Sequence, residues 1–199
     1  HQCLDDFAIA DIEDPVAGRG FRLGRGGGGP SSRWHRRRAR LPDGTYETNP
    51  ARRPVAIDFY NNYMTNFHDN PFETDGSMHN IRVMRNMMIN SASHAFCNQP
   101  AVGGPVYWIR NIAYNLPGGS SRLTGGSAGV LLYNNTILSE TQANGTSNTH
   151  WRNNLFLGQN SAPAIFSVTT YTNYTSSDYN GFRPNPGAAT AFQWNSPPA

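Results

Sequence analysis

A short phrase recurs along this chain, and it constrains the fold more than any other feature of the sequence. It reads IRVMRNMMIN at residues 81–90, and related versions begin at residues 106, 130 and 149. Each version has a few strand-forming residues, then Asn, then a second short apolar run. The asparagines that close the first run are Asn62, Asn86, Asn111, Asn135 and Asn154. Their intervals of 24, 25, 24 and 19 residues are typical of stacked repeat architectures.

The residues around the repeated Asn predict which side chains face the interior. Side chains alternate across a strand, so positions five and three before the Asn and two after it share its face. These three columns are Ile57, Ile81, Val106, Val130 and Thr149; then Phe59, Val83, Trp108, Leu132 and Trp151; then Met64, Met88, Ala113, Ile137 and Phe156. A buried Asn is tolerated when identical neighbours lie one rung away, about 4.8 Å along the stack, because the amides then satisfy one another. The sequence therefore predicts an all-β solenoid with an internal asparagine ladder.

Composition also favours strands and turns over helices. Charged residues make up only 15 % of the chain and the mean hydropathy is −0.58, so much of the polarity comes from uncharged Asn, Ser, Thr and Gly. Asn, Gly and Ser disfavour helix interiors. A second Asn follows four residues after the first in three repeats, at Asn66, Asn90 and Asn115. Because Asn tolerates left-handed backbone conformations, we expect a bend between sheets there.

The composition changes near residue 50, which predicts two parts. Residues 1–50 contain a Gly- and Arg-rich stretch that cannot bury enough apolar surface to offset its ordering entropy. We expect an irregular or disordered leader there, followed by the solenoid domain at residues 51–199 with an irregular tail from about residue 180. Cys3 and Cys97 lie far apart in sequence, and two unpaired thiols are expected rather than a disulfide.

The repeats resemble the right-handed parallel β-helix of pectate-lyase-like proteins over about residues 50–180, roughly five coils. The phrases FETDGSMHNIRVMRN and NQPAVGGPVYWIRNIAYN are similar to a bacterial branch of right-handed β-helix proteins of unassigned activity. The resemblance implies a right-handed parallel β-helix, a carbohydrate-related function and an extracellular or periplasmic location. It does not choose between lyases, hydrolases, epimerases, phage tailspikes and non-catalytic adhesins, because a fold does not fix a function.

Two columns are expected on the outer surface of the solenoid. Four residues before the ladder Asn stand Asp58, Arg82, Tyr107, Leu131 and His150; one residue before it stand Asn61, Arg85, Arg110, Asn134 and Asn153. Five rungs form a track on the order of 20 Å long, with Arg82, Arg85, Tyr107 and Arg110 at its centre. Arg pairs with uronate carboxylates and a Tyr ring offers an apolar face to a sugar, which predicts an acidic polysaccharide as partner. The alternative is a solvated outer face whose arginines bond to neighbouring loops.

The loop HDNPFETDGSMH, residues 68–79, holds three carboxylates: Asp69, Glu73 and Asp75. Carboxylates at this density suit a hard cation such as Ca²⁺, and they suit equally a carboxylate pair for glycoside hydrolysis. A structural alternative pairs Glu73 with Arg82 or Arg85. The nearby stretch NQPAVGGPVY carries Gln99 and the paired Gly103 and Gly104, and is expected to be a shaped turn that borders the track.

Two functions compete on these residues. The first is a polysaccharide lyase-like enzyme, in which Arg82, Arg85 or Arg110 neutralises a uronate carboxylate, Ca²⁺ on the acidic loop assists, and Tyr107 or His79 acts as the base. In this reading Arg110, Asp58, His150 and Gln99 bind the substrate. The second is a non-catalytic module that binds glycans through the same track or serves a structural role. The two functions can be distinguished by geometry. The enzyme requires the base, the arginines and the acidic loop to lie around one space the size of a sugar, whereas the binding module does not.

Charge and hydropathy limit the classes of partner that can be expected. The net charge is +3, and the chain has no Lys, so every strong cation is an arginine, a residue that suits carboxylates and nucleic acid equally well. Only the Gly- and Arg-rich leader suggests a nucleic-acid partner, and such a partner is therefore not expected. No apolar run approaches the roughly 20 residues of a membrane span. We expect the protein to be a monomer.

Overall fold

The computed structural model describes residues 55–77, 79–138, 145–159, 164–168 and 174–194. Within these residues every regular element is a β-strand. None of this described part forms a helix long and apolar enough to cross a membrane. The leader predicted at residues 1–50, together with Cys3, lies outside the described residues, so what was expected of it stays a prediction.

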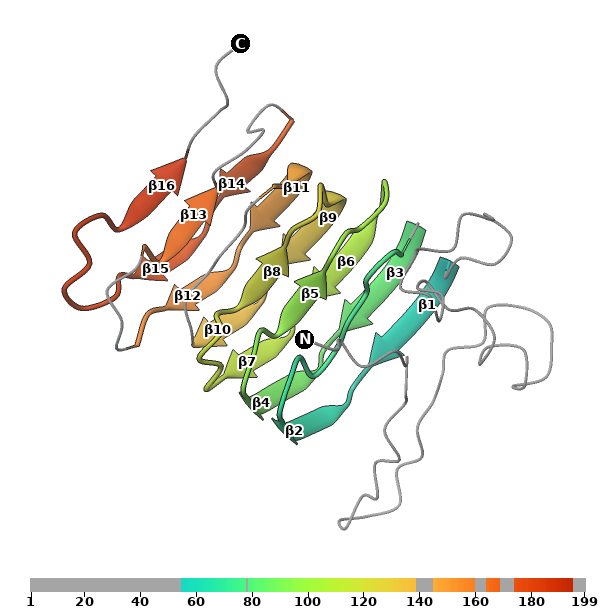
Figure 1. Ribbon diagram of the computed structural model, residues 1–199, viewed down its shortest axis with the longest axis horizontal. Helices are drawn as coiled ribbons and strands as arrows, with labels where there is room; N and C mark the ends of the chain where they lie inside the picture. Colours follow the sequence, from blue (N-terminus) through green and yellow to red (C-terminus); the bar gives the residue numbers. More distant parts are fainter. Residues whose placement is uncertain (1–54, 78, 139–144, 160–163, 169–173, 195–199) are drawn as a thin grey trace.

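The strands form stacked parallel rungs arranged as three faces (Figure 1). The first sheet contains β1 (Val55–Tyr60), β3 (His79–Met84), β6 (Val106–Ile109), β9 (Ala128–Tyr133), β11 (Ser147–Arg152) and β14 (Ser176–Asp178). The second sheet contains β2 (Tyr63–Phe67), β4 (Met87–Ser91), β7 (Ile112–Tyr114), β10 (Thr136–Leu138), β12 (Leu155–Leu157) and β15 (Gly181–Arg183). The third face contains two strand pairs, β5 (Phe96–Asn98) with β8 (Ser121–Leu123) and β13 (Phe166–Val168) with β16 (Phe192–Trp194).

Every pairing between the described strands is parallel. Each of the first two sheets has six strands, and the chain passes from one sheet to the other in every coil. Six successive rungs span about five turns, so the protein is a parallel β-solenoid of the predicted size. The all-β fold class expected from the repeats is confirmed.

The strand register confirms the three inward columns. Ile57 is in register with Ile81, and the column continues through Val106 and Val130 to Thr149. The other two columns are aligned in the same way from rung to rung. Their central members are fully buried and form one hydrophobic core along the solenoid axis.

The repeated asparagines form the predicted ladder, and Asn180 adds a sixth member. In each step Nδ2 of one ladder Asn donates to Oδ1 of the next at 2.9–3.1 Å. The same Oδ1 accepts the backbone N–H of the preceding ladder Asn at 2.8–3.0 Å. The second amide hydrogen donates to a backbone carbonyl of the previous rung, as from Asn111 to Val83 at 2.9 Å. Each interior amide therefore makes two donor and two acceptor contacts, which offsets the cost of burying it.

The solenoid extends further than the sequence pattern indicated. Asn180 follows Asn154 by 26 residues and accepts its amide hydrogen bond at 2.9 Å. Strands β15 and β16 then pair with β12 and β13 in the previous coil. Regular strands thus continue beyond residue 180, where an irregular tail was expected.

The second asparagine column has the left-handed backbone that the sequence indicated, but Asn66 and Asn90 lie within β2 and β4, and only Asn115 follows the end of its strand. Asn66, Asn90 and Asn115 have φ angles of 64°, 56° and 57°, and their exposed amides form a short second ladder. Gly104 has a φ of 67°, and a Cβ atom on it would overlap the backbone carbonyl of Gly129 one coil later. Left-handed or closely packed backbone is thus confirmed at these positions, whereas a bend between sheets at Asn66 and Asn90 is not.

We predict that the inner ladder stabilises the fold far more than the outer one. Asn111→Ala removes all four hydrogen bonds of the Asn111 side chain, so the backbone N–H of Asn86 and one of its side-chain N–H groups lose their acceptor. We expect a loss of about 3–5 kcal/mol in the free energy of unfolding, measured by urea denaturation. The matched control is Asn115→Gly on the exposed ladder, which keeps the left-handed backbone and should cost under about 1 kcal/mol. Equal losses in the two variants would contradict a structural role for the buried amides.

Candidate functional site: an arginine groove at the corner of the first sheet

The outer face of the first sheet carries the column that the sequence placed four residues before each ladder Asn. Asp58 is in register with Arg82, and Arg82 with Tyr107. The Arg82 guanidinium forms a two-point ion pair with the Asp58 carboxylate, with Nη2 to Oδ2 at 2.8 Å. Two residues expected to contact substrate separately therefore neutralise each other, and Arg82 is not a free positive charge.

Arg85 and Arg110 lie elsewhere, at the corner where the first sheet turns into the second. The position before each ladder Asn has a left-handed backbone; Asn61, Asn134 and Asn153 occupy it with φ of 59°, 59° and 55°, and Tyr179 occupies it with φ of 54°. Arg85 and Arg110 adopt the same conformation, each with φ of 56°. A left-handed backbone costs roughly 1–2 kcal/mol for most side chains and is least unfavourable for Gly, Asn and Asp. The backbone of Arg85 and Arg110 is thus strained, and strained backbone conformations cluster at functional sites.

The two corner arginines border a groove of about 410 Å³. It runs across the ends of four neighbouring rungs of the first sheet. Its walls are Tyr60, Met84, Arg85, Ile109, Arg110, Tyr133 and Asn134. Both arginine side chains are exposed. Among the described residues, neither guanidinium has a hydrogen-bond or ion-pair partner, so both are available to a ligand.

Tyr60 and Tyr133 belong to the groove, although the sequence pattern did not single them out. They stand two residues before the ladder Asn, a position that faces outward when the two-residue alternation is continued from Asp58 and Leu131. Extending the outward column by one more alternate position would have found them. Desolvation raises the pKa of Tyr133, opposed by Arg152 and reinforced by Tyr107. Tyr133 therefore stays protonated at neutral pH as an apolar ring with a hydroxyl donor.

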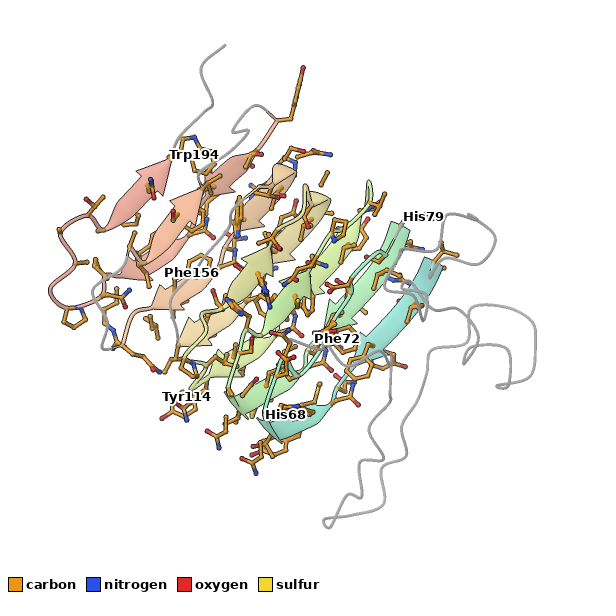
Figure 2. All side chains as sticks on the ribbon, in the orientation of Figure 1. His68, Phe72, His79, Tyr114, Phe156 and Trp194 are labelled. Atoms are coloured by element: carbon orange, nitrogen blue, oxygen red, sulfur yellow. The ribbon has the colours of Figure 1, made fainter. Side chains whose placement is uncertain are left out.

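Neither of the two histidines proposed for the site lines this groove. His79 is the first residue of β3, whereas Arg85 follows the last residue of that six-residue strand. At about 3.3 Å per residue the two are separated by roughly 20 Å, and Figure 2 shows His79 at the far end of the strand from the corner. His150 contacts Ser176 through Nδ1 at 2.8 Å and Asn148 through Nε2 at 3.2 Å. Both ring nitrogens of His150 thus have structural partners.

The acidic loop and Gln99 belong to the third face of the solenoid. Glu73 forms an isolated parallel bridge with Cys97, and Cys97 is in register with Arg122 in β8. The backbone N–H of Gln99 donates to the Asp75 carboxylate at 2.6 Å. The side-chain oxygen of Gln99, in the amide orientation that satisfies both groups, accepts from Arg122. Gln99 thus contacts the acidic cluster and does not border the corner groove.

The structural alternative that paired Glu73 with an arginine of the first sheet is wrong. Arg82 pairs with Asp58, and Glu73 instead accepts a hydrogen bond from the Asn70 amide at 2.9 Å. Asp69 does not join the other two acids; its carboxylate accepts the neighbouring N–H of Asn70 at 2.9 Å. The loop folds back on the third face because the bridge between Glu73 and Cys97 sets its register.

Glu73, Asp75 and Cys97 form a compact cluster, with one potential ligand atom from each within 4.8 Å of the others. Burial and the nearby Glu73 charge raise the pKa of Asp75 to about 7. Burial, followed by the charges of Asp75 and Glu73, raises the pKa of the Cys97 thiol well above its usual range. The Cys97 thiol donates to Asp75 at 3.6 Å and is free of any disulfide, as the sequence favoured.

This donor set fits Ca²⁺ poorly. Calcium prefers a shell of roughly six to eight oxygen atoms, whereas the cluster combines two carboxylates with a protonated thiol. The guanidinium of Arg122 already acts on both Asp75 and Cys97 as a neighbouring positive charge. Calcium binding by Asp69, Glu73 and Asp75 stays a prediction.

The comparisons with known proteins identify no relative. No protein-family model, no curated protein and no solved structure matches this chain.

We predict that Asp75 makes the protein less stable as the pH rises. Its pKa is about 7 in the folded protein, against an ordinary value of 3.8 for a solvated aspartate. Its contribution is therefore fully favourable below about pH 4 and is lost as the pH rises through about 7. Asp75→Asn should flatten the dependence of stability on pH in that window and stabilise the protein at pH 8 by roughly 2–4 kcal/mol.

Thermal unfolding followed at several pH values measures this effect. The matched control is Asp69→Asn, which makes the same change of charge in the same loop outside the cluster of Glu73, Asp75 and Cys97. A profile unchanged by Asp75→Asn would show that Asp75 does not titrate as its buried position requires.

Proposed function

We propose that this β-solenoid binds an acidic, uronate-containing polysaccharide along the corner groove, as a binding module. The observation that carries the proposal is the pair of unpartnered arginines at adjacent left-handed corners. Asn occupies the same corner in three other rungs without strain, so arginine there brings a charge at the expense of stability. The resemblance of the repeats to pectate-lyase-like β-helices supports carbohydrate as the class of ligand.

The spacing and surroundings of the arginines suit a charged polymer. Arg85 and Arg110 are one rung apart, about 4.8 Å along the stack, so their positive charges repel each other until an anion lies between or over them. Each guanidinium can grip a carboxylate through two parallel N–H donors. Tyr60 and Tyr133 line the same groove on either side of the arginines, and the apolar side of a sugar can pack on a tyrosine ring.

The geometry favours binding over cleavage. A lyase needs a base beside the carboxylate-neutralising cation. The described groove lining contains no carboxylate and no histidine, and its Tyr133 has a raised pKa, the wrong direction for a base. The acidic cluster lies on the third face, in a different sheet from Tyr107 and Arg82. The groups required for β-elimination are thus dispersed over the solenoid.

Calorimetric titration with a polyuronate and with its methyl ester tests the proposal. The two polymers share the sugar chain and differ in charge, so binding should occur with the free acid and disappear with the ester. Affinity should fall as salt is added, because the contacts are exposed ion pairs. Equal binding of both polymers, or of neither, would refute the proposal. An increase in ultraviolet absorbance from unsaturated product would instead establish a lyase.

We predict that Arg85→Asn with Arg110→Asn separates binding from stability. The affinity for the polyuronate should fall at least about tenfold, since two charge-assisted contacts are lost. The free energy of unfolding should stay the same or rise by up to about 1 kcal/mol per site, because Asn favours the left-handed backbone.

The matched control is the same loss of charge on another face. Arg183 lies in β15 of the second sheet and contacts the carbonyl of Gly158. Arg183→Gln should leave the affinity at the wild-type value. A similar loss of affinity in both proteins would mean that net charge, and not the groove, attracts the polymer.

A further inference from the structure

A serine, a histidine and an asparagine are joined by hydrogen bonds on the outer face of the first sheet. His150 in β11 is in register with Ser176 in β14, and its Nδ1 lies 2.8 Å from the Ser176 hydroxyl oxygen. Its Nε2 lies 3.2 Å from Oδ1 of Asn148, two residues earlier in β11. Ser176 and Asn148 are exposed, so a ligand can reach the hydroxyl. We call these three residues the serine triad.

The Asn148 contact determines which nitrogen of the neutral His150 ring carries the proton. An amide oxygen can only accept a hydrogen bond, so Nε2 carries the hydrogen and donates it to Asn148 Oδ1. Nδ1 is then the unprotonated nitrogen, and it accepts the hydroxyl hydrogen of Ser176. A nucleophile, a base and a group that orients the base are thus arranged as in the hydrolytic triads of unrelated folds.

The backbone N–H of Ser177 is positioned to stabilise an oxyanion. The Asp178 carbonyl accepts the N–H of Asn153, so the backbone polar groups of residue 178 point toward β11. Backbone groups alternate along a strand, so the N–H of Ser177 points to the opposite side. On that side β14 is the outermost strand of the sheet within the described residues. The N–H of the residue after the nucleophile is also one oxyanion donor of the α/β-hydrolases.

We propose that the serine triad is a second functional site, which hydrolyses carboxylic esters through an acyl-serine. Ser176 Oγ attacks the ester carbonyl, its proton passes to His150 Nδ1, and the Ser177 N–H stabilises the oxyanion. The carbon–oxygen bond of the ester then breaks, and the alcohol leaves with the proton from His150. A water molecule gives a proton to His150 and attacks the acyl group, and Ser176 regains its proton as the carboxylic acid departs. The net reaction converts an ester and water into an acid and an alcohol.

The surroundings of the triad favour an ester carried by an acidic sugar polymer. Arg152 lies two residues beyond His150, roughly 7 Å along the strand. Its guanidinium is exposed and lies over the Tyr179 ring, 5.2 Å from the centroid. Arg152 is also in register with Tyr133, which lines the corner groove. A uronate chain held in the groove can thus continue past Arg152 and bring an acyl ester to Ser176. This class of substrate rests on the proposed function, whereas the triad itself does not.

Hydrolysis of 4-nitrophenyl acetate by the full chain, together with labelling by a fluorophosphonate, tests the triad. We expect turnover above the buffer rate and one phosphonyl adduct, located on Ser176 by peptide mass spectrometry. Ser176→Ala should abolish the adduct and lower kcat at least about 100-fold. His150→Gln should lower kcat by a similar factor, because the base is lost.

Asn148 acts through His150, so its variants distinguish positioning from folding. Asn148→Asp keeps an oxygen acceptor and adds a negative charge that stabilises the imidazolium, so kcat should rise at least about tenfold at unchanged KM. Asn148→Gly keeps the left-handed backbone, whose φ is 45°, but removes the acceptor. Its kcat should fall at least about tenfold at unchanged KM. If Asn148 were merely structural, neither variant would change kcat.

The matched control is Ser167→Ala, which removes a hydroxyl that contacts Gln193 at 2.8 Å on the third face and should keep the wild-type rate. Far-ultraviolet circular dichroism identifies variants that keep the fold. No turnover and no adduct in the wild type, or an adduct that persists in folded Ser176→Ala, would overturn the triad.

Release of acetate from an acetylated polyuronate tests the class of substrate. The wild type should release acetate and Ser176→Ala should not, while Arg85→Asn with Arg110→Asn should raise the KM for this polymer at least about tenfold. Turnover of 4-nitrophenyl acetate without release of acetate would overturn the class of substrate. Ester hydrolysis by a protein that binds no polyuronate in calorimetry would overturn the proposed function and leave the triad standing. Polyuronate binding without any ester hydrolysis would do the reverse.

Discussion

The need to satisfy a buried amide governs this architecture. Each ladder Asn places a polar side chain inside the solenoid, where an unpaired donor or acceptor is costly. Its partners are the Asn and the backbone of the adjoining rungs, so no single coil can satisfy its own amide. The coils must therefore stack in one register. The hydrophobic columns on either side of the ladder follow the same register, because they lie on the strands that each ladder Asn connects.

The ladder also determines what the surface can carry. A strand that delivers its Asn inward must turn immediately, and it does so through a left-handed residue just before the Asn. This corner belongs neither to the first sheet nor to the second, and the Arg85 and Arg110 side chains on it are exposed. Arginine at two adjacent corners can then contact a ligand without disturbing the core. The strain is confined to one residue per rung, while the buried amides hold the backbone on either side.

The fold could be predicted in detail and the candidate site only in part, for a physical reason. Inward columns obey a two-residue alternation that packing enforces, so their register from Ile57 to Thr149 follows from spacing. Surface residues obey no such constraint. Arg82 and Arg85 lie three residues apart and were expected to act together, yet one neutralises Asp58 and the other stands at a corner. Tyr60 and Tyr133 were missed because an aromatic residue at an outward position resembles any other strand residue.

The spacing of the asparagines was sufficient to establish the repeat, the buried face and the bends, because each depends on backbone geometry that is local or periodic. The linear order could not tell which surface charges are already neutralised, since the Asp58–Arg82 pair joins residues a full coil apart. Nor could it show that the acidic loop faces Cys97 and Arg122 on the third side. Those relations arise only when the coils are stacked, because stacking decides which neighbour each outward side chain meets.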